Sequence, residues 1–96
     1  NVLAADQEAL SNRFASKKLE KVRFEGVDYD TGKTGAPLIR GAIANLDCSL
    51  SATHEVGDHL VFVGLIEEVR TQPGDPLVYW NGGYRALEKG PEEGAG

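Results

Sequence analysis

Two neighbouring stretches with different apolar patterns constrain the fold of this chain more than any other feature. Residues 42–52 alternate apolar and polar side chains, interrupted only by Ile43, and this period of two predicts a long, half-buried β-strand. Residues 60–66 are apolar throughout, which is typical of a strand covered on both faces. A glycine turn within residues 53–58 separates them, so we expect an antiparallel hairpin with a longish loop.

A short helix is predicted over residues 7–15, near the start of the chain. Asp6 is a suitable N-cap, and Glu8 places a negative charge in the first turn, where it interacts favourably with the helix dipole. Leu10 and Phe14 are four residues apart and therefore share one face of the helix.

The other elements predicted from the sequence are shorter. Residues 17–20 form a charged connector, residues 22–27 a brief extended piece, and Pro37 leads into the next strand. A third strong strand is expected over residues 77–80. The glycine- and glutamate-rich tail, residues 88–96, is predicted to be disordered. The chain is thus mainly β with one or two short helices, which favours a small barrel or sandwich.

Composition limits the classes of function. The 96 residues suffice for one small domain, and the net charge of −5 argues against a nucleic-acid or anionic membrane partner. The longest apolar run has seven residues, far short of a membrane span, and no signal peptide opens the chain. Cys48 is the only cysteine, so no intrachain disulfide or Cys/His metal pattern exists, and a reducing cytoplasmic location is expected. Because Cys48 alternates with Leu46 and Leu50, we expect it to be a small core residue.

The pair Asp58–His59 stands at the mouth of the apolar strand and is expected to mark the lip of a pocket. His59 is either a ligand contact or a strand-end histidine bonded to Asp58 or to a turn carbonyl. Asp58 itself is expected to organise the loop by binding turn amides.

Three aromatic residues surround a glycine turn at the end of the third strand. A glycine turn lets backbone approach a ligand closely, and Trp80 and Tyr84 would offer flat apolar faces beside Asn81 and Gly82. The alternative is an ordinary hairpin turn, because Asn-Gly is a common hairpin signal.

Residues before and on the predicted helix are candidates for binding an anionic group. Free backbone amides at residues 4–7 could receive a phosphate, although Asp6 is equally well explained as a plain N-cap. Arg13 either pairs with a phosphate or is a solvated helix charge.

Several ordered pieces of the chain resemble one family. They are Asn-Val-Leu-Ala-Ala-Asp-Gln at 1–7, Leu-Ser-Asn-Arg-Phe-Ala at 10–15, Gly-Ala-Pro-Leu-Ile at 35–39, Ala-Asn-Leu-Asp-Cys at 44–48, Gly-Asp-His at 57–59, and Pro-Leu-Val-Tyr-Trp with Gly-Gly-Tyr-Arg-Ala-Leu within 76–87. Their order and spacing resemble the flavin reductase-like family, the small NAD(P)H:flavin oxidoreductases that supply reduced flavin to two-component monooxygenases.

The resemblance implies an antiparallel Greek-key split β-barrel, homodimeric, that binds FMN or FAD near the subunit interface and uses NADH or NADPH as co-substrate. It implies that residues 1–87 are the C-terminal part of such a domain, without its opening strands, and that reduced flavin reaches a partner monooxygenase by diffusion. It assigns to the flavin Ala4, Ala5, Asp6, Gln7, Ser11, Arg13 and Phe14, and to the nicotinamide nucleotide His59, Trp80, Asn81, Gly82 and Tyr84. A non-catalytic flavin-binding or structural split-barrel module is the alternative.

Overall fold

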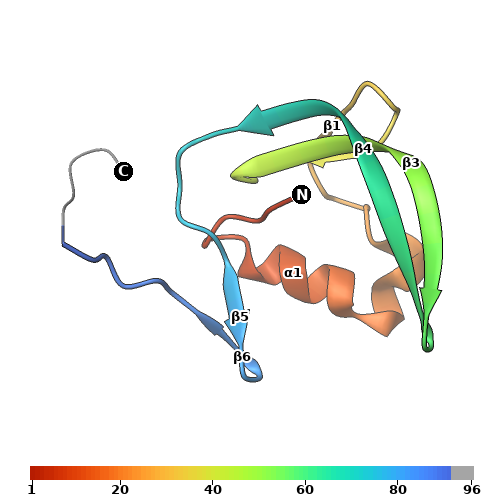
Figure 1. The fold of residues 1–96 in the computed structure, drawn as a ribbon. Coiled ribbons are helices and arrows are strands. Elements are labelled where there is room, and N and C mark those ends of the chain that lie inside the picture. Colours follow the sequence, from red (N-terminus) through yellow and green to blue (C-terminus); the bar gives the residue numbers. More distant parts are fainter. Residues whose placement is uncertain (92–96) are drawn as a thin grey trace.

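The computed structural model describes residues 1–91. Its elements are α1 (Glu8–Ala15), the 3₁₀ helix η1 (Lys17–Val22), β1 (Tyr29–Thr31), β2 (Pro37–Ile39), β3 (Ala44–Val56), β4 (His59–Thr71), β5 (Val78–Trp80) and β6 (Gly83–Arg85). The expected mainly β chain with short helices is therefore confirmed. The strands form three antiparallel pairs, β1–β2, β3–β4 and β5–β6 (Figure 1). Because each strand pairs with its neighbour in sequence, residues 1–91 do not close into a barrel.

The β3–β4 hairpin dominates the molecule and arches over α1 (Figure 1). Each strand has 13 residues, and the ladder continues to the pair Val56–His59. The loop is only Gly57–Asp58, and the φ of 60° at Gly57 suits the first central position of a type II′ turn. The predicted longish loop is therefore wrong, since residues 53–56 extend the strand. Register shifts between Asp47 and Cys48 and between Leu50 and Ala52 are the kind of irregularity that bends a hairpin.

The predicted inward and outward faces of β3 are reversed at its start. Asn45 and Asp47 are buried, whereas Leu46 and Leu50 are 42% and 66% exposed and Cys48 is exposed as well. The expectation that Cys48 is a core residue is therefore wrong in this structure. Burial of the polar face is tolerated because its groups are bonded: Asn45 donates to Asn1 Oδ1 at 2.7 Å and to the Ile39 carbonyl at 3.2 Å.

The apolar run of β4 is also exposed, contrary to the prediction. Leu60, Phe62 and Ile66 are 57%, 65% and 52% exposed, because no element of residues 1–91 packs over this part of the hairpin. The buried apolar core is small and lies elsewhere, at Leu38, Ile39 and Ala42, where β2 approaches β3.

The N-terminal segment joins the β3–β4 hairpin to the segment that leads into the β5–β6 hairpin. The amide of Val2 donates to the Ala44 carbonyl at 2.8 Å, and the amide of Leu77 donates to the Leu3 carbonyl at 2.9 Å. Residues 2–4 thus lie between the start of β3 and the segment before β5 (Figure 1). This places the beginning of α1 close to both hairpins.

Helix α1 matches the predicted range within one residue, but its N-cap is Gln7 and not Asp6. The side chain of Gln7 is occupied instead by the backbone: Oε1 accepts from the Ala4 amide at 2.9 Å, and Nε2 donates to the Arg40 carbonyl at 3.0 Å. Gln7 therefore ties the entry of α1 to the turn after β2.

Some of the shorter predicted elements differ from the structure. Residues 17–20 belong to η1 instead of a connector, and residues 22–27 turn, with the Glu25 amide bonded to the Val22 carbonyl at 3.1 Å. β2 begins at Pro37 and β5 lies within residues 77–80, as predicted. Of the predicted disordered tail, residues 88–91 belong to no helix or strand, and residues 92–96 lie outside the described residues. No helix within residues 1–91 is long and apolar enough to cross a membrane.

Candidate functional site

The hydroxyl of Tyr84 brings together two groups of predicted site residues. It lies 2.8 Å from Ser11 Oγ and 3.0 Å from Asn12 Oδ1. The Asn12 oxygen can only accept, so the single Tyr84 proton points to it and the Ser11 hydroxyl donates to Tyr84 in turn. This contact joins β6 to α1, across more than 70 residues of sequence.

The turn between β5 and β6 presents Trp80 to solvent. Asn81 and Gly82 have φ values of 49° and 81°, the left-handed pair that a type I′ turn requires, and this confirms the hairpin signal. Trp80 is 72% exposed. Behind it the rings of Tyr79 and Tyr84 pack edge to face, with centroids 5.3 Å apart. The indole is thus an exposed flat face on a hairpin that Tyr84 anchors.

Arg13 is engaged with backbone carbonyls. Its Nε donates to the Arg23 carbonyl and its terminal nitrogen to the Val22 carbonyl, each at 2.7 Å. These acceptors lie at the C-terminal end of η1, where carbonyls lack helical partners. Neither sequence interpretation of Arg13 anticipated this role: the guanidinium fixes η1 against α1.

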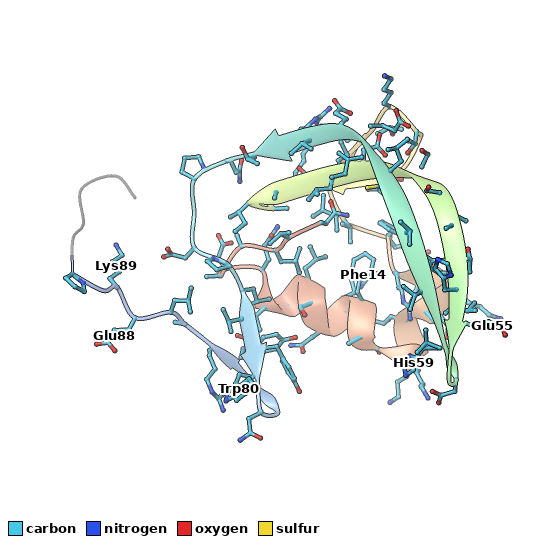
Figure 2. All side chains as sticks on the ribbon, viewed as in Figure 1. Phe14, Glu55, His59, Trp80, Glu88 and Lys89 are labelled. Carbon is cyan, nitrogen blue, oxygen red and sulfur yellow. The ribbon has the colours of Figure 1, made fainter. Side chains whose placement is uncertain are left out.

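Phe14 belongs to an aromatic cluster. Its ring packs edge to face on Phe24 at 5.0 Å, and Phe24 packs in the same way on Tyr29 at 5.5 Å. Figure 2 shows Phe14 on the side of α1 that faces the arch of the long hairpin. The cluster connects α1 with the segment that follows η1 and with β1.

Residues 4–7 line a hollow of about 430 Å³ together with Gly41 and the loop at residues 72–75. The amides of Ala4, Ala5 and Gln7 already donate to Gln7 Oε1, the Asp75 carbonyl and the Ala4 carbonyl. Asp6 and Asp75 add two carboxylates to the lining. In this conformation the segment shapes a cavity wall and offers few free donors for an anion.

A second hollow, of about 790 Å³, has a different character. Leu10, Leu19, Val27 and Ile39 give it an apolar surface, and its charged residues are two arginines and two carboxylates, Arg13, Arg40, Glu25 and Asp28. Gln7 lines both hollows. Its size and its mixture of apolar surface with a few polar groups are those of small-molecule sites. The two carboxylates balance the charge of the two arginines.

His59 lies at the tip of the long hairpin, on a different element from Trp80 (Figure 2). Its side chain is 82% exposed, and Nε2 is 3.4 Å from Asp58 Oδ1. His59 lines neither of these hollows, nor a third beside Asp30 and Arg70, so within residues 1–91 the expectation of a pocket lip has no support. Asp58 makes no hydrogen bond to a turn amide in the described chain, and its proposed organising role is also wrong.

The sequence did not point to Asn12 or Arg40. Asn12 shares Tyr84 with Ser11, and Arg40 lines the larger hollow and forms an ion pair of 2.7 Å with Asp30. No local pattern marks either residue, because their partners are distant in sequence. Within residues 1–91 no three His, Cys, Asp or Glu side chains are placed to hold a metal ion.

Comparison with known proteins gives a consistent result. The family profile described as "Flavin reductase like domain" matches residues 1–88. The chain is 36% identical to the reductase subunit HsaB of a flavin-dependent monooxygenase from Mycobacterium tuberculosis, covering 92% of this chain and 48% of that protein. It is 39% identical to an NADH-dependent flavin reductase of Rhodococcus sp, again covering 92% and 48%.

A solved structure is equally similar. The NADH:FAD oxidoreductase SgcE6 of Streptomyces globisporus, in complex with NAD and FAD fragments, superposes with a TM-score of 0.84 at 32% identity, covering 94% of this chain and 55% of that one. The chain thus spans about half the length of the relatives that it matches.

Proposed function

Because the chain belongs to the flavin reductase-like domain family, we propose that the protein catalyses NAD(P)H-dependent reduction of free flavin, FMN or FAD. The observation that carries the proposal is the Tyr84 contact, which fixes an exposed tryptophan turn beside the helix assigned to the flavin. Hydride transfer between two cofactors requires mainly that their rings be held in register. A turn bound through Tyr84 to Asn12, which lines the larger hollow, is an arrangement suited to that task.

The residues fit a flavin in part. The larger hollow has an apolar surface, which suits the ring system of a flavin, and its two arginines are accompanied by the carboxylates of Glu25 and Asp28. The smaller hollow, with its two carboxylates, suits a phosphate poorly. We therefore assign the flavin ring to the larger hollow, and leave Ala4, Ala5 and Asp6 to shape the wall of the smaller one. When bound, the flavin ring accepts the hydride that the nicotinamide ring gives up.

On the nicotinamide side, we assign Trp80 and the Asn81–Gly82 turn as a platform for the nucleotide. An exposed indole can stack on a flat heterocycle, and the turn exposes backbone at close range. We also assign His59 to this site, as a polar contact to the nucleotide. It lies on the β3–β4 hairpin and would reach the nucleotide from there. The proposal covers both NADH and NADPH as co-substrate.

The experiment that tests the function uses the complete protein with FMN or FAD and NADH or NADPH. Flavin absorbance should bleach without oxygen, and nicotinamide oxidation should depend on added flavin. The competing hypothesis is a non-catalytic split-barrel module, which the solvent-exposed position of His59 favours. A protein that binds flavin without bleaching, or binds none, would establish that alternative.

The partners follow from the same proposal. Reduced flavin would leave by diffusion and serve a flavin-dependent monooxygenase; the Mycobacterium tuberculosis relative is named as the reductase subunit of such an enzyme. We also propose a cytoplasmic location, where the exposed Cys48 thiol would stay reduced.

A homodimer is proposed from the exposed face of the long hairpin. Leu46, Leu50, Phe62, Ile66 and Val69 are between 42% and 66% exposed, and an apolar patch of this kind marks an interaction site. We propose that a second copy of the protein covers it. Light scattering should give a dimer mass for the wild type and a monomer for Phe62→Asp. A wild-type monomer would contradict the proposed dimer.

A further inference from the structure

We infer that Tyr84 is a positioning residue and not a direct nicotinamide contact. This inference rests on the proposed function and refines it. The hydroxyl of Tyr84 is bound to Ser11 and Asn12 of α1, so it is directed to the helix and is occupied there. Through this link Tyr84 sets the position of the turn that carries Trp80.

The geometry leaves Tyr84 little freedom to serve a ligand. The phenol can donate one proton, which Asn12 Oδ1 takes, and it accepts from Ser11. Its ring edge packs against Tyr79 at 5.3 Å. Ring and hydroxyl are therefore both committed to contacts within the chain.

The contact is also the side-chain hydrogen bond that connects the β5–β6 hairpin with α1. Within residues 1–91, the only other hydrogen bond from a side chain of this hairpin runs from Arg85 to the carbonyl of Tyr84 itself. A two-stranded hairpin is marginally stable alone. Backbone bonds of Leu77 with Leu3 and of Ala5 with Asp75 hold the segment before β5 at the start of α1, and the Tyr84 hydroxyl adds the direct link from the hairpin to the helix.

This role has a consequence for the reaction. Ser11, which the sequence assigns to the flavin, uses its hydroxyl to hold Tyr84, so the same pair joins the flavin side to the nicotinamide side. When the pair is broken, the turn should move more freely, and the nucleotide should bind more weakly because ordering the turn then costs entropy. The Michaelis constant for NADH should rise more than kcat falls.

The chain offers a matched control. Tyr84→Phe removes the bound hydroxyl and keeps the ring, whereas Tyr79→Phe removes a phenol hydroxyl from the other ring of the same pair. Tyr79 is 64% exposed, and its hydroxyl has no protein partner in the described residues. Both variants preserve the aromatic packing, so they differ in the link to α1.

Two readouts on the complete protein test the inference. The first is steady-state NADH oxidation with FMN: Tyr84→Phe should raise the Michaelis constant for NADH about fivefold, the effect of losing one or two ordinary hydrogen bonds, and Tyr79→Phe should leave it unchanged. The second needs no cofactor. The fluorescence anisotropy of Trp80, the single tryptophan of these 96 residues, should fall in Tyr84→Phe and stay unchanged in Tyr79→Phe. Trp80→Phe protein supplies the background signal.

A second variant breaks the same link from the α1 side, so that misfolding caused by Tyr84→Phe itself can be recognised. Asn12→Ala, on the exposed surface of α1, should shift both readouts in the same direction as Tyr84→Phe, and the double variant should add little to Tyr84→Phe. Equal Michaelis constants and anisotropies for Tyr84→Phe and Tyr79→Phe would overturn the positioning role. A wild-type protein that oxidises no NADH would instead overturn the proposed function and with it the kinetic part of this inference. The anisotropy would then decide separately whether the hydroxyl fixes the turn.

Discussion

Thr34 binds the carboxylate of Asp47, the most completely buried polar residue of the described chain. The Thr34 amide donates to Asp47 Oδ2 at 2.9 Å, the Thr34 hydroxyl donates to the other carboxylate oxygen, and Asp47 is 1% exposed. Asp47→Asn should lower the melting temperature by about 5 °C, because a neutral amide oxygen accepts a hydrogen bond less strongly than a carboxylate does. Thermal unfolding followed by circular dichroism measures the change.

Asp58→Asn is the matched control for this prediction. The Asp58 side chain is 95% exposed and its closest ionic contact is His59 at 3.4 Å, so the same chemical change should alter the melting temperature by less than about 1 °C. Equal decreases in melting temperature for Asp47→Asn and Asp58→Asn would show that the contact with Thr34 does not stabilise the folded state.

The stabilising effect of Asp47 should also depend on pH. Hydrogen bonds from Thr34 hold the pKa of Asp47 below its ordinary value of 3.8. A carboxyl whose pKa is lower in the folded state contributes its full stability above the unfolded-state pKa and loses it as pH falls through the folded-state pKa. The difference in urea midpoint between wild type and Asp47→Asn should therefore be constant above about pH 5 and shrink below about pH 4. A difference that grew under acid would contradict this account.

The buried position of Asp47 also explains why sequence reasoning succeeded only in part. Alternation correctly identified a strand at residues 42–52, because the period of two is a local property. It could not say which face would be covered, since that depends on Asn1 and Thr34, which approach from elsewhere in the chain. The same limit applies at the candidate site. The Asn81–Gly82 turn could be predicted from two neighbouring residues, whereas the contact between Ser11 and Tyr84 could not, because it joins residues far apart in the sequence.

Gly64 is required by the close approach of the two long strands. A Cβ atom at this position would lie 2.8 Å from Cys48 Cβ, closer than packing allows. Gly64→Ala should therefore destabilise the hairpin by about 1–3 kcal/mol, as overpacking does, and Cys48→Gly in the same chain should recover part of that loss. Urea unfolding of the single and double variants measures the coupling.

Gly90→Ala provides the comparison for this steric argument. Nothing lies within 4 Å of a Cβ atom at that glycine, so its free energy of unfolding should stay within about 0.5 kcal/mol of the wild type. If Gly64→Ala lowered the free energy of unfolding no more than Gly90→Ala does, β3 and β4 would have to move apart at Cys48 without loss of stability, and the steric argument would be wrong.

Gly82 tests backbone conformation without a steric clash. Its φ is 81°, and a Cβ atom there would meet nothing within 4 Å, so Gly82→Ala adds only the strain of a left-handed conformation, about 1–2 kcal/mol. We expect lower fluorescence anisotropy of Trp80 and weaker NADH binding, because the turn would lose its type I′ geometry. Unchanged anisotropy and binding would show that the nucleotide does not use this turn.

The assignment of His59 can be tested against the other histidine of the same hairpin. His59→Ala should raise the Michaelis constant for NADH about five- to tenfold in the complete protein, the effect of losing one polar contact to the nucleotide. His54→Ala is the control, because His54 also lies on the hairpin, opposite Val61, and is exposed. An unchanged constant in His59→Ala would remove His59 from the nicotinamide site. Equal increases of the Michaelis constant in His59→Ala and His54→Ala would show that either substitution perturbs the hairpin as a whole. Only a direct contact of His59 with the nucleotide would make the two variants differ.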